Sequence, residues 1–219
     1  MELRKGAKRT IWKIRIELKP GSSSMKARQT LHNFTRSAVF KEGKMIDTFT
    51  IKETRLSYLL SNDMKQPGEI LTTFNDPFNK EYQIAARIAR KGNIRLNMEL
   101  DGENPSIKGT VPVRMAILTN HSMIDFENDQ NKRETLKASI EETMNKQFAE
   151  LIQKTQEELG SEPFGWSLAA RKEFRTIPEF TAFDWMKTYP EMDIDIKTEV
   201  EFENFGRQTD LPSLEEVRD

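Results

Sequence analysis

The chain has 219 residues, and its 34 basic and 35 acidic side chains nearly cancel to a formal net charge of −1. This balance argues against a nucleic-acid-binding protein, which would carry a basic excess on one face. Cysteine is absent, which excludes disulfides, thiolate nucleophiles and cysteine zinc sites. No segment approaches the roughly 20 apolar residues of a membrane-spanning helix, and no apolar run behind the N-terminus indicates a signal peptide.

A strand is predicted at residues 11–18, where Ile14, Ile16 and Leu18 alternate with charged side chains. This period of two is typical of a half-buried strand. The Pro-Gly-Ser-Ser-Ser sequence at residues 20–24 then predicts a flexible loop or linker. It lacks the spacing and the Lys-Ser/Thr ending of a phosphate-binding loop.

A β-hairpin is predicted at residues 38–46, where Lys-Glu-Gly-Lys separates two short apolar runs. Residues 53–60 carry three leucines on one helical face and predict a short helix. The Pro67-Gly68 pair, together with Asn62, then ends this element.

Residues 69–118 have the composition and alternation of strands. Three alternating apolar sets lie at residues 82–88, 94–100 and 111–117. Gly92 lies in the short break between the first two sets, and a longer polar segment separates the last two. These breaks predict an antiparallel meander.

The clearest element is a long helix at residues 131–159, in which apolar residues recur at steps of three and four. The recurring residues are Leu136, Ile140, Met144, Phe148, Leu151, Ile152, Thr155 and Leu159. Asn131 and Glu134 match a capping box, and Gly160 stands where the helix should stop. We expect this stripe to pack on the apolar face of the strands, although it could instead dock a partner helix.

Pro163 suits the first turn of a further helix that extends to Phe174. A short helical turn is predicted at residues 185–189, and the alternation at residues 192–202 predicts a long strand with one wet face. The predicted fold class is therefore α+β: an antiparallel sheet packed against a long α-helix plus shorter helices.

Neither catalytic nor cofactor-binding nor metal-binding residues are predicted. His32 and His121 lie far apart in sequence and match no zinc pattern. Four acidic residues within 193–201 share a strand face, but successive ones lie about 7 Å apart, too far to share one ion without other ligands. We interpret them as a solvated strand face interleaved with Lys197. The sequence motifs provide neither a nucleophile with a base nor a metal site with an open position.

Several short motifs follow one another in order along most of the chain. They are SAVFKEGK at residues 37–44, ETR at 53–55, EPFGW at 162–166, YPE at 189–191, and the strand 193–205 followed by Gly206. In this order and spacing they resemble the C-terminal domain of the Ger(x)C family, the C subunits of nutrient germinant receptors in spore-forming bacteria. Ser37 and Glu162 stand where this family has Gly and Asp, so the paralogue is left open.

The resemblance implies three segments. Residues 1–35 would be the end of a preceding domain or a linker segment with one strand, residues 36–206 the Ger(x)C-like α+β domain, and residues 207–219 a flexible tail. It also implies a lipoprotein on the outer face of the spore inner membrane, without enzymatic activity or cofactor. Its partners would be the A- and B-type membrane subunits of the receptor. The lipidated cysteine is absent from this chain, so we expect a fragment that lacks the N-terminal portion.

The leading hypothesis is an interaction or assembly domain acting in spore germination. Exposed aromatic residues are the best interface candidates, and we select Trp12 and Phe78. The alternative is a small-molecule module that binds the nutrient, for which the sequence shows no motif. An enzyme of unrecognised type is a third hypothesis, which would require perturbed carboxylates in a cleft.

Overall fold

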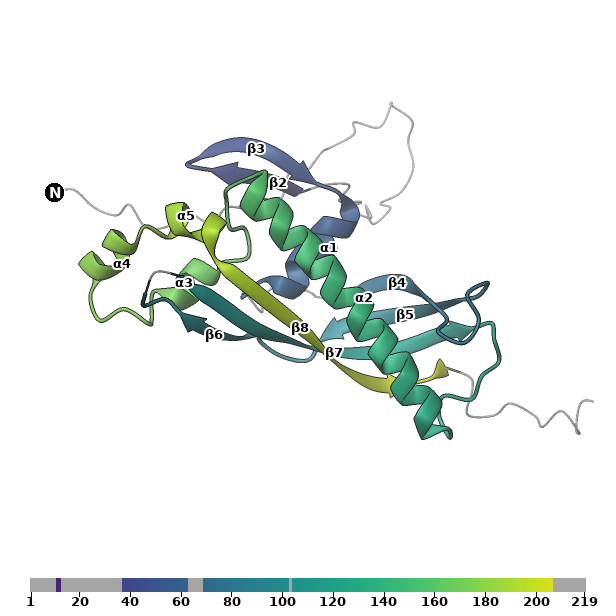
Figure 1. Ribbon diagram of the computed structural model, residues 1–219. Coiled ribbons are helices and arrows are strands. Elements are labelled where there is room, and N and C mark those ends of the chain that lie inside the picture. Colours follow the sequence, from purple (N-terminus) through teal and green to yellow (C-terminus); the bar gives the residue numbers. More distant parts are fainter. Residues whose placement is uncertain (1–10, 13–36, 63–68, 103, 207–219) are drawn as a thin grey trace, which may run out of the picture.

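A computed structural model describes the backbone of residues 11–12 and all atoms of residues 37–62, 69–102 and 104–206 (Figure 1). The predicted linker at 20–24, most of the predicted N-terminal strand, His32 and the tail beyond Gly206 lie outside these residues.

The N-terminal part forms a small antiparallel sheet with strand order β1-β2-β3. Its strands are β1 (Ile11–Trp12), β2 (Ser37–Lys41) and β3 (Lys44–Phe49). Glu42 and Gly43 both have positive φ, at 51° and 81°, and two such residues make the tight turn that fits the twist of a hairpin. The predicted hairpin is confirmed.

Helix α1 (Ile51–Leu60) follows directly and confirms the predicted short helix. It begins with a capping box. The Thr50 hydroxyl accepts from the Glu53 amide at 3.3 Å, and the Glu53 carboxylate accepts from the Thr50 amide at 2.6 Å. The two reciprocal bonds satisfy amides that a helix start would otherwise leave unpaired.

A five-stranded sheet forms the larger platform. Its strands are β4 (Ile70–Asn75), β5 (Gln83–Arg90), β6 (Arg95–Glu99), β7 (Ser106–Asn120) and β8 (Asp193–Asn204). The long strand β7 pairs with β5 and β6 along one edge and with β8 along the other. Val113, for example, is opposite both Arg90 of β5 and Val200 of β8.

Two features of this topology differ from the sequence prediction. The break at residues 91–93 is not a hairpin turn between paired strands. Strands β5 and β6 instead run one after the other along β7, and the Lys91 amide donates to the Pro112 carbonyl at 2.9 Å between them. Strand β8 is parallel to β7, which makes the sheet mixed. The α+β class itself, with a sheet against a long helix, is confirmed.

Helix α2 (Gln130–Glu157) crosses the sheet next to β8 (Figure 1). Its buried residues are Leu136, Ile140, Met144, Phe148, Leu151, Ile152 and Thr155, as the period predicts. The prediction of a capping box at Asn131 and Glu134 is wrong. Asp129 caps the helix by accepting from the Lys132 amide at 3.1 Å, whereas Glu134 accepts from the Gln130 side chain.

Helix α2 also covers the open edge of β8. The Asn145 side-chain oxygen accepts from the Thr198 amide at 2.7 Å, and the Glu141 carboxylate accepts from the Val200 amide at 2.9 Å. These backbone donors point away from β7, where no further strand of the described residues pairs with them. Side chains of the helix thus take the place of a neighbouring strand.

Short helical elements connect α2 to β8. They are α3 (Trp166–Ala170), α4 (Ile177–Phe183), α5 (Trp185–Thr188) and the 3-10 turn η1 (Tyr189–Glu191). The helix predicted to reach Phe174 ends at Ala170, and α4 was not predicted. Phe174 packs instead against Phe180 and Phe183, with ring centroids 5.5 and 5.2 Å apart.

Candidate functional site

The two predicted interface residues, Trp12 and Phe78, lie in different parts of the fold. Trp12 lies in β1, where its backbone pairs with Ala38, but its side chain is outside the described atoms. Phe78 lies in the loop between β4 and β5 and is 44% exposed. Its ring also packs on the buried Phe126, with centroids 6.1 Å apart.

The loop that carries Phe78 is held by hydrogen bonds. The buried Asp76 carboxylate accepts from the amides of Phe78 and Asn79, at 2.8 and 3.3 Å. The Asp76 amide donates to the Tyr82 carbonyl at 3.1 Å, and the Tyr82 amide to the Asn79 carbonyl at 3.0 Å. These bonds close the loop at its base, so Phe78 is presented from a defined position.

Other exposed apolar side chains lie at the same end of the large sheet. Tyr82 and Met123 are 41% and 65% exposed. Ile84 of β5 pairs with Asn120 of β7, which brings the segment after Tyr82 beside the segment before Met123. We name Phe78, Tyr82 and Met123 the distal apolar surface. Sequence patterns did not indicate Tyr82 or Met123, because their place at one end depends on strand register.

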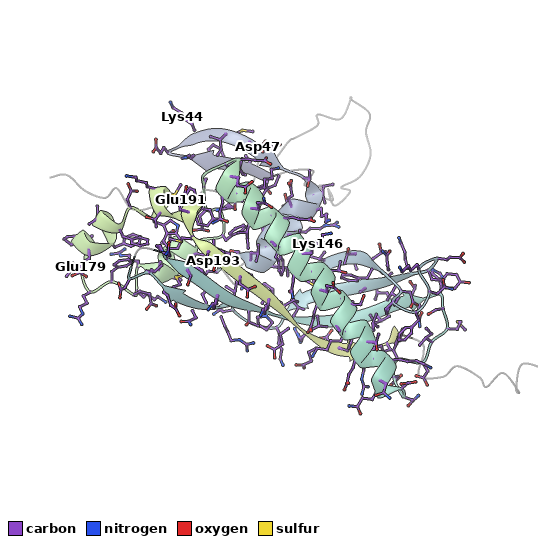
Figure 2. All side chains as sticks on the ribbon, in the orientation of Figure 1. Lys44, Asp47, Lys146, Glu179, Glu191 and Asp193 are labelled. Atoms are coloured by element: carbon purple, nitrogen blue, oxygen red, sulfur yellow. The ribbon has the colours of Figure 1, made fainter. Side chains whose placement is uncertain are left out.

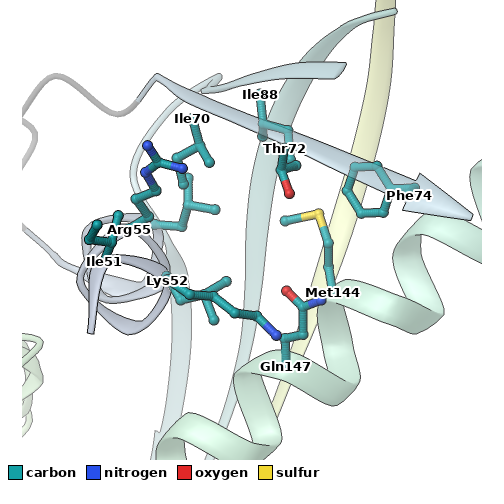
Figure 3. A pocket seen from close by; sticks show the side chains of 11 residues that line it. Ile51, Lys52, Arg55, Ile70, Thr72, Phe74, Ile88, Met144 and Gln147 are labelled. Carbon is teal, nitrogen blue, oxygen red and sulfur yellow. The ribbon is translucent and has the colours of Figure 1, made fainter. Parts of the chain in front are cut away.

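A second feature is a cavity of about 310 Å³ between α1, α2 and strands β4 and β5 (Figure 3). Its lining residues are Ile51, Lys52, Arg55, Leu56, Leu59, Ile70, Thr72, Phe74, Ile88, Met144 and Gln147. Leu59, Ile88 and Met144 are buried, whereas Lys52 and Arg55 are exposed. The cavity therefore has an apolar floor and reaches the molecular surface.

The cavity has a simple origin in the strand pairing. Thr72 of β4 is opposite Ala86 of β5, whereas the flanking cross-strand pairs are Ile70 with Ile88 and Phe74 with Ile84. Two small side chains thus lie between pairs of large ones on the face that α1 and α2 cover. The large side chains of the flanking pairs hold the helices away from the sheet, so α1 and α2 cannot contact the small Thr72–Ala86 pair closely. Space is therefore left between the helices and this pair.

The third feature is a densely packed junction where α1, α2, α3 and η1 meet. The Trp166 indole N–H donates to the Leu60 carbonyl at 2.8 Å, and the Asn62 amide donates to the Phe164 carbonyl at 3.0 Å. The Tyr189 hydroxyl shares a hydrogen bond of 2.6 Å with Thr155. The side chains of Trp166, Phe164 and Tyr189 are almost fully buried.

Glu162 is a buried carboxylate at the centre of this junction, with only 4% exposure. Burial raises the pKa of its carboxyl group, and hydrogen bonds from the loop amides, including those of Ser167 and Phe164, partly oppose this shift. Burial likewise raises the pKa of the nearby Tyr189 phenol. The Glu162 carboxyl group accepts hydrogen bonds from amides of its own loop, and Glu162 does not line the cavity between α1 and α2. We therefore interpret it as a structural residue.

The described residues hold no group of three or more His, Asp or Glu side chains that could bind a metal ion. His121 is exposed. The acidic residues at 193, 195, 199 and 201 are all exposed, which confirms the solvated strand face. Two of them, Glu201 and Glu199, pair with Lys91 and Arg95. Within the described ranges, no helix has the length and apolar character needed to span a bilayer.

The chain is similar to known proteins in both sequence and fold. Residues 35–206 match the family described as "Spore germination B3/GerAC like, C-terminal". The chain belongs to this family. Among solved structures, GerBC has the same fold, with a TM-score of 0.59 and 17% sequence identity over 77% of this chain. The match covers 51% of the GerBC chain, so the present chain spans about half the length of that protein. A search of curated proteins gave no match.

The family assignment confirms the resemblance that the sequence motifs indicated. In this Spore germination B3/GerAC like domain, the EPFGW motif forms the junction, and the SAVFKEGK motif forms β2 and its turn. Both motifs are therefore structural in this chain. Neither contributes a side chain to the cavity or to the distal apolar surface.

Proposed function

We propose that this chain is part of a germinant receptor C subunit and acts as a non-enzymatic assembly domain in spore germination. Its partners would be the A- and B-type membrane subunits of the receptor. The subunit would be held by a lipid anchor at the outer face of the spore inner membrane. Residues 36–206 would form the assembly domain, with residues 1–35 leading in from a preceding domain.

The observation that supports an assembly role is the presentation of Phe78. An aromatic ring that is half exposed on a loop closed by Asp76 loses little conformational entropy on binding. Aromatic residues are enriched at protein interfaces and often carry much of the binding energy. Tyr82 and Met123 add exposed apolar area at the same end of the sheet.

The test is a pull-down of the A- and B-type subunits with the wild-type chain and with Phe78→Ala. We expect retention to fall at least about tenfold, because an aromatic anchor is worth roughly 2 kcal/mol or more at an interface. Trp12→Ala belongs in the same assay as the second interface candidate. Ile177→Ala is the matched control, since Ile177 is 62% exposed on α4, outside the distal apolar surface.

Thermal unfolding of each variant separates lost binding from lost folding. A Phe78→Ala chain that unfolds at nearly the wild-type temperature and still retains both subunits would overturn the assembly role of this surface. Equal losses for Phe78→Ala and Ile177→Ala would also overturn it, because the effect would then not depend on the surface.

A second candidate function is a small-molecule binding module of the same receptor. The cavity between α1 and α2 favours it, because its volume of about 310 Å³ lies at the lower end of the usual range of ligand pockets, about 300–1,000 Å³. A thermal shift screen with amino acids, sugars and organic acids tests this function, since a ligand that binds only the folded chain raises its melting temperature. No shift with any compound would count against nutrient binding.

A further inference from the structure

The cavity between α1 and α2 has the two parts of a site for a small amphiphile. Its inner wall consists of apolar side chains from four elements: Leu59 of α1, Met144 of α2, Ile70 of β4 and Ile88 of β5. The polar groups near this wall are the Thr72 hydroxyl and the Gln147 amide (Figure 3). A short hydrocarbon tail fits this environment, whereas a strongly polar molecule would lose hydrogen bonds to water there.

The rim of the cavity is positively charged. Lys52 and Arg55 lie one turn apart on α1 and are both exposed, and Figure 3 shows Lys52 extending toward Gln147 of α2. One guanidinium nitrogen of Arg55 donates to the Leu71 carbonyl at 3.2 Å. The remaining guanidinium donors of Arg55 have no hydrogen-bond partner among the described residues, so they can donate to a ligand.

Described carboxylates do not neutralise this rim. The described residues that line the cavity include no Asp or Glu. Glu53, which lies between the two cations in sequence, is held by the Lys154 ammonium at 2.8 Å and by the Thr50 amide. Burial opposes ionisation of Glu53, but these hydrogen bonds outweigh it and hold its pKa below the usual value. The Glu53 carboxylate is therefore paired with Lys154 and forms no ion pair with Lys52 or Arg55 in the described structure.

We propose that this cavity binds a small anionic amphiphile: an organic acid whose short aliphatic tail enters the apolar floor and whose carboxylate meets Lys52 and Arg55. The charge on the rim selects against an amine with the same tail. It also disfavours a zwitterionic amino acid, because the ammonium group would lie beside two cations without a described carboxylate to receive it. This inference is independent of the assembly role of the distal apolar surface.

Hexanoate is a suitable probe, and the Met144 methyl group is a suitable reporter because it lies in the cavity (Figure 3). With the chain carrying 13C-labelled methionine methyl groups, hexanoate is titrated and the methyl resonances are followed by NMR. We expect a saturable shift of the Met144 signal, assigned with Met144→Leu. The Met123 signal serves as an internal control, because Met123 is 65% exposed on the distal apolar surface.

Hexylammonium, 1-hexanol and leucine test the charge requirement. We expect each to bind more weakly than hexanoate, by up to about fivefold for each ion pair that is lost at the surface. Lys52→Gln and Arg55→Gln should each weaken hexanoate binding by up to about fivefold. Lys146→Gln is the matched control, because Lys146 is exposed on α2 and does not line the cavity (Figure 2).

Thr72→Leu and Thr72→Val form a second pair of variants. Leucine occupies the space above the Thr72–Ala86 pair and should abolish the Met144 response, whereas valine keeps the volume of threonine and should preserve it. The proposal is overturned if hexanoate leaves Met144 unshifted. It is also overturned if 1-hexanol or hexylammonium binds as tightly as hexanoate, or if Lys146→Gln weakens binding as much as Lys52→Gln does.

Discussion

The same two helices pack closely at one end and leave space further along. At the junction, the ends of α1 and α2 meet Trp166, Phe164 and Tyr189, which are almost fully buried. Toward the start of α1 and the middle of α2, the helices span the small Thr72–Ala86 pair, and a cavity of about 310 Å³ remains. The difference indicates that the junction contributes mainly to stability, whereas the cavity leaves space for a ligand.

Removing Trp166 should have the largest effect on this comparison. Trp166→Ala removes a fully buried indole ring and leaves a void in its place, and it leaves the Leu60 carbonyl without its donor. We expect the free energy of unfolding to fall by about 3–5 kcal/mol, measured by urea denaturation. Trp166→Phe is the milder control, which keeps one aromatic ring but removes the indole donor and part of the ring volume, and it should cost less than Trp166→Ala.

If Trp166→Ala costs less than about 1 kcal/mol, the junction does not dominate stability. The contrast between the two regions would then fail, whatever the cavity binds. Urea midpoints are interpretable only if the slope of the transition stays at its wild-type value.

Glu162→Gln should have an intermediate effect that depends on pH. The amide cannot accept all the backbone donors that the carboxyl group accepts, so we expect a loss of about 1–3 kcal/mol near pH 4. Burial raises the folded-state pKa of Glu162 above its unfolded value. The advantage of the wild type over Glu162→Gln is therefore fully present below the unfolded pKa, and it declines as the pH rises toward the folded-state pKa.

Denaturation of both proteins between pH 4 and 7 measures this difference directly. A wild-type advantage that grows with pH over this interval would contradict the prediction. It would show that the loop amides favour the charged carboxylate by more than burial disfavours it.

The smallest effect is expected in the cavity. Thr72→Leu adds apolar volume where space is available, so we expect a gain in the free energy of unfolding of about 0.5–1 kcal/mol. Thr72→Val, which adds no volume, is the control, and calorimetry or urea denaturation provides the measurement. A loss of more than about 1 kcal/mol for Thr72→Leu alone would show overpacking, and the region would then be as closely packed as the junction.

Features that depend on local periodicity could be predicted from the sequence. The stripe from Leu136 to Thr155 is buried as the helical period requires, and the Glu42–Gly43 turn closes the predicted hairpin. The cap of α2 was predicted at Asn131 because Asn131 and Glu134 have the spacing of a capping box. In the structure the nearby Asp129 is the cap and accepts from the Lys132 amide. A single sequence does not reveal which of two neighbouring acceptors takes the amide.

Features that depend on how strands are paired could not be predicted. Gly92 suggests a hairpin turn, but β7 is long enough to pair with β5 and β6 in succession. Alternation along β8 is the same for a parallel and an antiparallel strand. The cavity follows from the pairing of Thr72 with Ala86, and neither residue is unusual until the register is known. Phe78 was identified as an interface candidate from its position between Asp76 and Asn79, and its binding role stays a prediction.

The contacts from α2 to the outer side of β8 have a consequence for how copies of this domain can associate. A strand offered by another chain would have to displace Asn145 and Glu141 from the amides of Thr198 and Val200 before it could form a ladder there. Uncovered strand margins are the usual starting points of fibrous aggregation. Helix α2 therefore protects this edge of β8 against strand-to-strand aggregation, because its side chains already occupy the amides of Thr198 and Val200.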